Sequence, residues 1–125
     1  MNSRNTFEPG SRFEHEDGNT RLEFHLRDCV GGMGDLVPDG SVDLVVTSPP
    51  YNLGIAYGKY DDTLERDEYL EWSEEWAGAV RRALKPDGAL FLNVGAAPKN
   101  PYLPHELVLR HHKSFRPRRP NWHRM

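Results

Sequence analysis

The chain has 125 residues, a hydrophobic share of 37% and a formal net charge of −3, which suit one small domain with a modest core. The sequence contains no apolar run near the roughly 18 residues needed to span a bilayer and no signal-peptide core, so we expect a soluble, intracellular protein of the cytoplasm without a membrane partner. Cys29 is the only cysteine, which excludes an internal disulfide and a cysteine-based zinc cluster, and a lone cysteine is most often a small core residue.

The charges are distributed unevenly. Residues 1–109 contain 10 Lys and Arg against 19 Asp and Glu, whereas residues 110–125 contain six basic side chains and no acidic one. The acidic part is a poor electrostatic match for nucleic acid. The basic end is able to contact phosphates, although a charge run is more often simply solvated. Residues 110–125 also lack an apolar period, so we predict a disordered basic tail. The histidines of the tail are His111, His112 and His123. We do not expect them to bind a metal, because no cysteine or carboxylate lies nearby in the sequence.

The first part of the chain is predicted to contribute one strand. Residues 1–20 combine Asn, Ser, Gly, Pro and charged side chains without an apolar period, which indicates a disordered lead-in. Residues 21–26 alternate charged and apolar side chains, which is typical of a strand. Three glycines in residues 31–34 make the next segment a poor helix by propensity, although its other residues still supply an apolar face.

A short apolar run ends in two prolines near the middle of the chain. Residues 42–46 are mostly β-branched and follow a Pro-Asp-Gly turn, so we predict a buried strand. Pro49 and Pro50 end that strand, because proline lacks an N–H and fixes its own φ. Residues 48–51 are therefore expected to form a stiff loop at the carboxyl end of the strand, which is the edge where open α/β sheets bind ligands.

This loop carries groups that suit the exocyclic amine of a nucleobase. Such an amine is a poor nucleophile, because its lone pair is delocalised into the ring. Two acceptors that take its two N–H bonds would turn the lone pair out of the ring plane, and the candidates are the Ser48 hydroxyl and the Pro49 carbonyl, whose direction Pro50 fixes. Stacking on Tyr51 would return roughly 1–3 kcal/mol of the few kcal/mol that extruding a base costs. The alternative is a chance Ser-Pro-Pro-Tyr in a proline-rich turn.

Residues 63–84 show the clearest helical pattern. Their apolar side chains recur at spacings of three and four, with most glutamates off that stripe, and basic side chains end the segment as the helix dipole favours. The two tryptophans of the stripe are expected in the core and not as base-stacking groups. The stripe consists of Tyr69, Trp72, Trp76, Val80 and Ala83.

A second strand and a further helix follow. A Pro-Asp-Gly turn at residues 86–88 leads into an apolar run at residues 89–94, which predicts a short strand. A helix that joins two buried strands implies a right-handed crossover and a parallel sheet. Residues 104–110 are predicted to begin another helix, with Pro104 at an early position.

Two segments are expected beside the proline loop. Residues 93–98 should emerge at the same sheet edge, where Gly95 and Ala96 would leave room for a base. Residues 53–62 are predicted to form a mobile loop over the site, because their glycines permit closure. The candidates in that loop for contacts with nucleic acid are Lys59 and two tyrosines that equally suit packing on the domain, Tyr57 and Tyr60.

The proline loop and its neighbours carry a family resemblance. Thr-Ser-Pro-Pro-Tyr at residues 47–51, with Asp-Leu-Val-Val before it and Asn-Leu-Gly after it, resembles the catalytic motif of the amino-methylating DNA methyltransferases, in the permuted class whose catalytic segment comes first. The resemblance extends from about Leu26 to Leu107 and includes Leu-Lys-Pro-Asp-Gly at residues 84–88 and Leu-Pro at residues 103–104. The serine form of the motif resembles the cytosine-N4 group, whereas adenine-N6 enzymes more often carry Asp or Asn there.

The resemblance implies an α/β fold. We expect a partial Rossmann-like S-adenosyl-L-methionine-dependent methyltransferase fold, with a parallel sheet and crossover helices, that is incomplete at the C-terminus. Residues 21–109 would form the catalytic-motif part of that domain, between the lead-in at residues 1–20 and the tail at residues 110–125. Contacts of Asp28 and of Thr47 with the cofactor are implied, although Asp28 equally suits capping of the segment that follows. The catalytic residues that the resemblance implies are Ser48, Pro49, Pro50 and Tyr51.

The implied activity is a DNA methylation of the prokaryotic or phage restriction-modification type. The acceptor would be cytosine N4 in a base flipped out of double-stranded DNA, and neither a metal nor a covalent protein intermediate is needed. The Phe-x-Gly-x-Gly cofactor turn and the target-recognition region of the family do not occur in the sequence, so we expect a truncated chain. The alternatives are an inactive remnant, one half of a split enzyme completed by a second polypeptide, adenine-N6 specificity, and a small-molecule amine methyltransferase.

Overall fold

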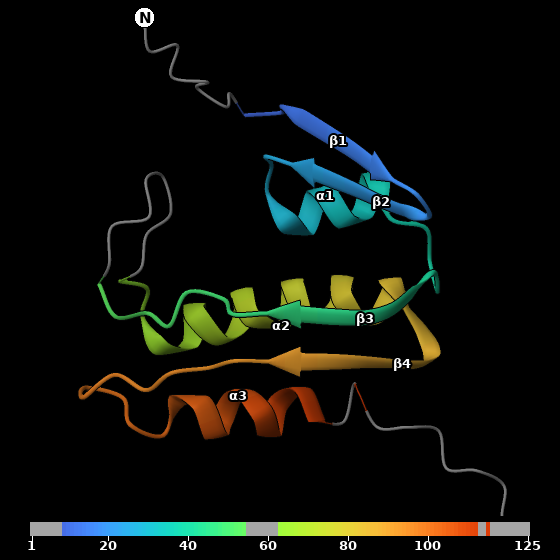
Figure 1. Cartoon of the computed structure of the whole chain (residues 1–125). Helices are drawn as coiled ribbons and strands as arrows, with labels where there is room; N and C mark the ends of the chain where they lie inside the picture. Colours follow the sequence, from blue (N-terminus) through green and yellow to red (C-terminus); the bar gives the residue numbers. More distant parts are fainter. Residues whose placement is uncertain (1–8, 55–62, 113–114, 116–125) are drawn as a thin grey trace, which may run out of the picture. The chain divides into compact units, whose positions relative to one another are not determined.

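The computed structural model describes residues 9–54, 63–112 and 115 (Figure 1). Within these residues the elements follow the order β1, β2, α1, β3, α2, β4 and α3. The chain divides into two compact units, residues 1–37 and residues 38–125, where the sequence had indicated a single domain. Among the described helices, none combines the length and the apolar character that crossing a membrane requires.

The first unit begins with an antiparallel hairpin of β1 (Arg12–Asp17) and β2 (Thr20–His25). The strand predicted at residues 21–26 is confirmed, but the disordered lead-in is wrong for β1. The charged side chains of β1 made the segment look disordered in the sequence. In the structure they pair across the hairpin, since Arg21 donates to Glu14 at 2.8 Å. Phe13 and Phe24 also meet with ring centroids 6.0 Å apart.

Helix α1 (Cys29–Leu36) completes the first unit and forms in spite of its glycines. Asp28 is its N-cap, and an ion pair of 2.5 Å joins Arg27 to Asp35 across its length. These polar contacts compensate for poor propensity. Cys29 is exposed, so the expectation of a core cysteine was wrong.

The second unit contains the crossover that the sequence predicted. Strands β3 (Val42–Thr47) and β4 (Leu84–Leu92) pair in parallel, and α2 (Arg66–Ala83) joins them. Strand β4 begins five residues earlier than expected. Its register shifts between the pairs Val42–Leu84 and Leu44–Ala89, so the Pro-Asp-Gly segment lies inside the strand as an irregularity. Glycine suits position 88, since a Cβ there would make a tight contact of 3.0 Å with the carbonyl oxygen of Val42.

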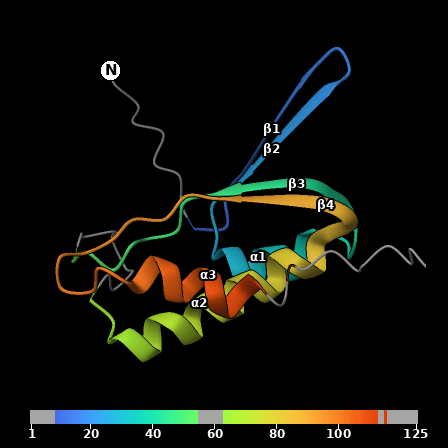
Figure 2. The same ribbon diagram turned by 90° about the horizontal axis from the view of Figure 1, so that it is seen from below.

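Two helices cover one face of the β3–β4 pair. Both α2 and α3 (Leu103–His112) lie on the same side of the strands (Figure 2). Trp76 is 3% exposed, which confirms its predicted place in the core, whereas Trp72 is half-buried. The buried apolar residues on α2 and α3 are Tyr69, Leu70, Trp76, Ala77, Val80, Ala83, Leu103 and Leu107.

The opposite face of the strands is apolar and exposed. Leu44, Val46 and Phe91 are 51%, 72% and 63% exposed, and they alternate with residues that face the helices. The fold is thus α/β with a parallel pair and a helical crossover, as expected for part of a methyltransferase-like sheet.

Helix α3 extends further than the sequence indicated. It continues to His112, so the disordered tail predicted from residue 110 is wrong for residues 110–112. His111 is 6% exposed, and its ring centroid lies 5.7 Å from that of Trp76. The rest of the predicted tail, apart from Phe115, lies outside the described residues.

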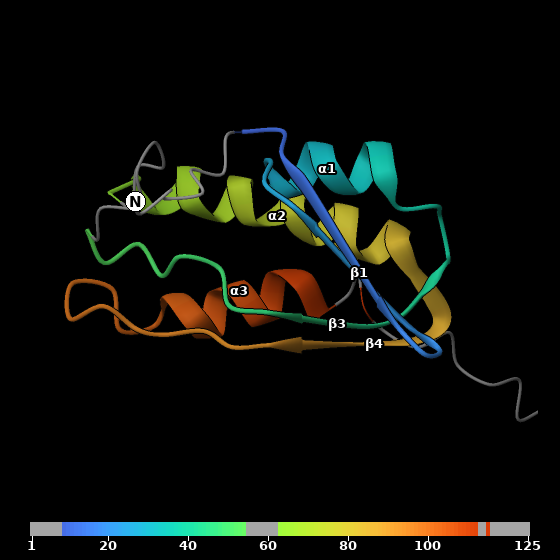
Figure 3. The same cartoon turned by 45° about the horizontal axis from the view of Figure 1, so that its top comes forward.

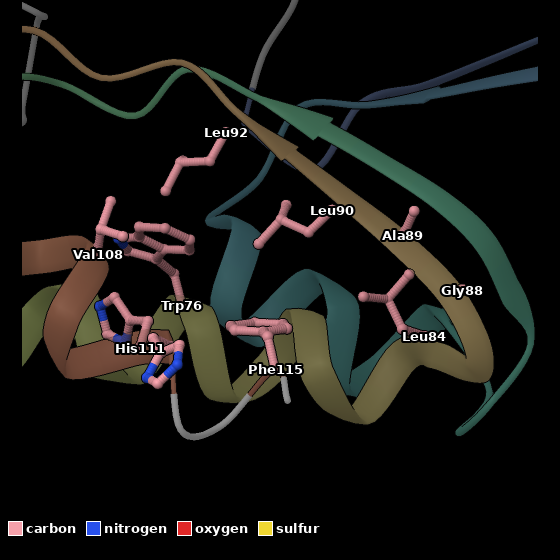
Figure 4. Close-up of a pocket in the computed structure, with 10 residues that line it drawn as sticks. Trp76, Leu84, Gly88, Ala89, Leu90, Leu92, Val108, His111 and Phe115 are labelled. Atoms are coloured by element: carbon pink, nitrogen blue, oxygen red, sulfur yellow. The ribbon is translucent and has the colours of Figure 1, made fainter. Parts of the chain in front are cut away.

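An apolar cavity of about 340 Å³ lies between α2, β4 and α3 (Figure 4). Leu90 and Leu92 point into it from β4, and Trp76 and His111 line it from the helices. No residue of the proline loop is among its lining residues, so this cavity is separate from the site described next.

Candidate functional site

The candidate site lies where β3 and β4 end. The segments that follow the two strands leave the same edge of the sheet (Figure 3), as the parallel crossover predicted. Pro49 is buried and Tyr51 is half-buried, while Ser48 is exposed at the surface of the loop. The loop is therefore anchored at Pro49, and Ser48 is accessible from solvent.

Three side chains form a hydrogen-bonded cluster, which we call the hydroxyl cluster: Ser48, Tyr51 and Asn93. Ser48 Oγ and Tyr51 Oη are 2.6 Å apart. Asn93 Nδ2 donates to Tyr51 Oη at 2.8 Å and lies 3.4 Å from Ser48 Oγ. The structure thus brings two of the predicted catalytic residues together through a third residue that the sequence reading had not singled out.

The backbone of Asn93 ties the two strand ends together. Asn93 directly follows β4, and its N–H donates to the carbonyl oxygen of Thr47 at 3.0 Å. Thr47 is the last residue of β3 and pairs with Leu92. Asn93 therefore continues the parallel ladder by one bond, which fixes the start of its side chain relative to the proline loop.

Gly95 makes room for the ring of Tyr51. A Cβ at Gly95 would lie 2.6 Å from Tyr51 Cδ2 and 2.9 Å from Cε2, closer than any side chain tolerates. The sequence had suggested that Gly95 leaves space for a base. In the structure the ring of Tyr51 packs against Gly95.

Helix α2 fixes the proline loop through a hydrogen bond. The hydroxyl of Tyr69, a residue 2% exposed, donates to the Pro50 carbonyl oxygen at 2.7 Å. The chain then turns at Asn52, whose φ of 59° is one that asparagine adopts more readily than most residues. Its amide donates to the carbonyl oxygen of Leu64 at 2.6 Å. The bond from Tyr69 engages the Pro50 carbonyl, while the role of the Pro49 carbonyl as an acceptor stays a prediction.

Asp28 acts as a helix cap. Its Oδ1 accepts hydrogen bonds of 3.0 Å from the N–H groups of Val30 and Gly31 at the start of α1. The capping interpretation is confirmed, while a contact of Asp28 with a cofactor stays a prediction, as does a cofactor contact of Thr47.

Some of the predicted groups are not placed by the structure. Residues 55–62, with Tyr57, Lys59 and Tyr60, lie outside the described residues. Within the described part of the chain, no group of three or more His, Cys, Asp or Glu side chains could hold a metal ion.

Two site residues were missed for different reasons. Asn93 stands at the end of an apolar strand, a position where polar residues of α/β sheets meet ligands, and that placement could have identified it. Tyr69 belongs to the apolar stripe of α2, and its spacing carries no information about its hydroxyl. Chemically, the hydroxyl cluster is a group of hydrogen-bonding side chains able to bind a polar ligand.

Comparisons with known proteins place this loop in a family. The model of the N6/N4 DNA methylase family matches residues 42–120, more than half of the chain. The type II methyltransferase M.MjaVI of Methanocaldococcus jannaschii is 50% identical over 58 residues, which are 46% of this chain and 30% of that protein. The type II methyltransferase M.HpaI of Haemophilus parainfluenzae is 47% identical over 57 residues, which are 46% of this chain and 18% of that protein.

A solved structure is also similar. The PvuII DNA methyltransferase (cytosine-N4-specific) has a TM-score of 0.48 and 29% sequence identity, and the match covers 63% of this chain and 29% of that one. The present chain spans less than a third of each of these proteins. Because the family model matches both strands, the proline loop and helices α2 and α3, the chain belongs to the N6/N4 DNA methylase family.

Proposed function

We propose that this chain supplies the methyl-acceptor site of a DNA methyltransferase of the restriction-modification type. The reaction transfers a methyl group from S-adenosyl-L-methionine to the exocyclic amine of a base flipped out of double-stranded DNA, with cytosine N4 as the preferred acceptor and adenine N6 as the alternative. The observation that supports the proposal most directly is the hydroxyl cluster, which lies at the carboxyl end of β3.

The residues of the loop have separate roles in this proposal. The Ser48 hydroxyl and the Pro49 carbonyl accept the two N–H bonds of the amine, which draws its lone pair out of conjugation with the ring. Tyr51 stacks on the base with the part of its ring that does not face Gly95. Stacking offsets roughly 1–3 kcal/mol of the few kcal/mol that extrusion costs. Pro50 fixes the direction of the Pro49 carbonyl, and Tyr69 holds the loop in place.

The cofactor supplies the methyl group when it is bound. Asp28 and Thr47 are the candidate contacts, and each already uses one oxygen within the chain: Asp28 Oδ1 caps α1, and the Thr47 carbonyl accepts from Asn93. The second carboxylate oxygen of Asp28 and the hydroxyl of Thr47 are the groups that this proposal assigns to the cofactor.

A nucleoside-binding assay tests the acceptor site in the chain as it exists. We expect 2′-deoxycytidine to bind in the millimolar range, about 1 mM, as measured by ligand-observed NMR, and 2′-deoxyuridine, which has no amine, to bind more weakly. Ser48→Ala should weaken deoxycytidine binding about fivefold to tenfold, because one hydrogen bond is lost. The matched control is Ser41→Ala, at the opposite end of β3.

The outcomes separate the alternatives. Equal binding of deoxycytidine and deoxyuridine, or no effect of Ser48→Ala, would contradict an amine-binding role for the loop. Comparison with 2′-deoxyadenosine in the same assay decides between the two acceptor bases. An inactive remnant is distinguished by weak DNA binding that falls steeply with salt and is blind to sequence, together with the absence of nucleoside binding.

A further inference from the structure

Strand β4 has a strand beside it on one edge and none on the other. In the described part of the chain its sheet contains only β3 and β4. The N–H of Asn93, directly after β4, points to β3 and donates to Thr47. Because the backbone groups of successive residues in a strand point in opposite directions, the N–H and C=O groups of Leu90 and Leu92 face the outer edge. Within the described residues these groups have no backbone partner on that edge.

The apolar cavity of about 340 Å³ lies beneath the same part of β4 (Figure 4). The side chains of Leu90 and Leu92 point into it, and Val108 of α3, which is 51% exposed, lines it as well. A cavity needs only about 10–15 Å³ to hold one water, so this one has room for whole side chains. Two of its lining residues carry a buried nitrogen without a hydrogen-bond partner among the described residues, namely Trp76 Nε1 and His111 Nε2. Such groups are rare in complete cores, which indicates that the packing around the cavity is unfinished.

The crossover rule places a further strand at this edge. Helices α2 and α3 lie on the same side of the strands (Figure 2). With right-handed connections, the chain moves across the sheet from β3 to β4 through α2, and a connection through α3 continues in the same direction, to the outer edge of β4. The edge and the cavity beneath it therefore form a position for one more parallel strand.

The residues that follow α3 in the sequence are poorly suited to this position. Alternate side chains of a strand would face the apolar cavity. One register of such a strand would direct Arg119 toward the cavity, and the other would direct Arg116 and Arg118 toward it. Burial of an unpaired charge in apolar surroundings is costly. Pro117 and Pro120 are an odd number of residues apart, so one of them would face β4 without an N–H.

We propose that the outer edge of β4 binds an extended segment of a second, basic polypeptide, which adds a strand parallel to β4 and places apolar side chains in the cavity. Backbone hydrogen bonds to Leu90 and Leu92 provide affinity, and the cavity selects apolar residues at alternate positions of the segment. Charge favours a basic partner, since residues 1–109 contain 10 Lys and Arg against 19 Asp and Glu, whereas a second copy of the chain carries the same net charge of −3. This inference does not depend on the role of the proline loop.

A synthetic peptide tests the open edge. The probe is a short peptide of alternating valine and threonine with lysines at both ends. In the control peptide two neighbouring central residues are proline, so that either edge of the peptide lacks an N–H. We would add each peptide to the full chain and follow hydrogen exchange of the Leu90 and Leu92 amides by NMR. The probe should bind in the millimolar range, about 1 mM, and at saturation should slow the exchange of both amides about fivefold, whereas the control peptide should not.

The Val108→Phe variant tests the cavity. The larger ring takes up part of the cavity from α3, so binding of the probe peptide should weaken about fivefold to tenfold. Leu109→Phe is the matched control, because Leu109 is the next residue on the same helix, is 70% exposed and is not among the lining residues. Thermal unfolding of both variants verifies that they fold. Equal binding of the peptide to the two folded variants would overturn the assignment of the cavity to the added strand.

The charge of the peptide tests the kind of partner. A peptide with glutamates in place of the lysines should bind more weakly at low salt, and the difference should shrink as the salt concentration rises. Equal binding of the two peptides at low salt would overturn the choice of a basic partner.

Two results of the exchange experiment would overturn the proposal as a whole. Exchange of the Leu90 and Leu92 amides that no peptide slows would mean that the edge does not bind a strand. Slow exchange of these amides in the chain alone would mean that a second copy or residues 116–125 already occupy the edge. The nucleoside titration measures the proposed function separately, so the failure of either proposal is recognised by itself.

Discussion

The hydroxyl of Tyr69, in the first turns of α2, donates a 2.7 Å hydrogen bond to the carbonyl oxygen of Pro50, 19 residues earlier in the chain. The bond is shielded from solvent, since Tyr69 is 2% exposed. It connects the crossover helix to the proline loop, so the core that stabilises the second unit also fixes the position of the loop that carries Ser48 and Tyr51.

Tyr69→Phe should therefore affect both stability and the site. The variant keeps the ring in the core but leaves the Pro50 carbonyl without its donor, which should lower the free energy of unfolding by about 1 kcal/mol. Deoxycytidine binding should weaken as well, because the loop is held less firmly. Urea denaturation and the nucleoside titration measure the two effects. Tyr102→Phe is the control, since Tyr102 is 75% exposed and its change should stay within about 0.5 kcal/mol. Equal stability of both variants would show that the bond to Pro50 contributes nothing.

Gly95→Ala should disrupt the packing of Tyr51. The new methyl would lie 2.6 Å from a ring carbon, so the ring or the segment after β4 must move. Overpacking of this kind costs about 1–3 kcal/mol, and displacement of the Tyr51 hydroxyl should also weaken nucleoside binding. Thermal unfolding and the titration measure these changes.

The control for this prediction is Gly78→Ala on α2. A Cβ at Gly78 has no atom within 4 Å, and alanine is the better helix former by about 1 kcal/mol, so this variant should be more stable than the original chain. If Gly95→Ala lowers the stability and Gly78→Ala raises it, the effect at Gly95 comes from its close contact with Tyr51 and not from the replacement of glycine in general. A neutral result at Gly95 would mean that Tyr51 has room to move.

The two halves of the site differ in how far the sequence could predict them. The loop at residues 48–51 and the parallel crossover could be predicted from the sequence, because the effect of proline on the backbone and the period of the hydrophobic residues are local signals. The cluster could not, because Asn93 meets Tyr51 across 42 residues and only the register of the β3–β4 pair brings them together. Strand β1 was also missed, since the ion pairs that compensate its charges form across the hairpin and cannot be read from one strand alone.

Asp28 offers a test that separates a structural role from a functional one. Asp28→Ala removes the cap of α1 and should cost about 1 kcal/mol of helix stability, whereas Asp28→Asn retains a capping oxygen and should cost little. Hydrogen exchange of the amides of α1 measures the difference within the first unit. If binding of S-adenosyl-L-methionine is detected, a loss of binding in the asparagine variant with intact protection of α1 would assign the carboxylate to the cofactor. Equal protection in both variants would contradict the capping role.

His111 predicts a dependence of stability on pH. Its side chain is buried against Trp76, and burial lowers the pKa of His111, with Arg110 acting in the same direction and Glu74 opposing it. Arg110 and Glu74 form an ion pair of 3.0 Å, so their effects on the imidazole partly cancel and burial dominates. The folded protein therefore keeps this imidazole neutral at a pH where the unfolded chain protonates it. Because the unfolded state then binds more protons, this contribution to stability is fully present above the ordinary histidine pKa of about 6.5 and is lost progressively as the pH falls through the lowered folded pKa.

The variant His111→Phe should remove this dependence. Phenylalanine keeps an aromatic ring next to Trp76 and cannot be protonated, so the loss of unfolding free energy between pH 7 and pH 5 should be smaller than in the original chain. His105→Gln on the same helix is the control, because His105 is exposed and lies outside the contact between His111 and Trp76. Denaturant midpoints at several pH values measure the effect. An unchanged pH profile in His111→Phe would mean that His111 is protonated equally in the folded and unfolded states. That result would contradict the effect of burial on this side chain. The carboxylates of the surface ion pairs would then be the source of any loss of stability in acid.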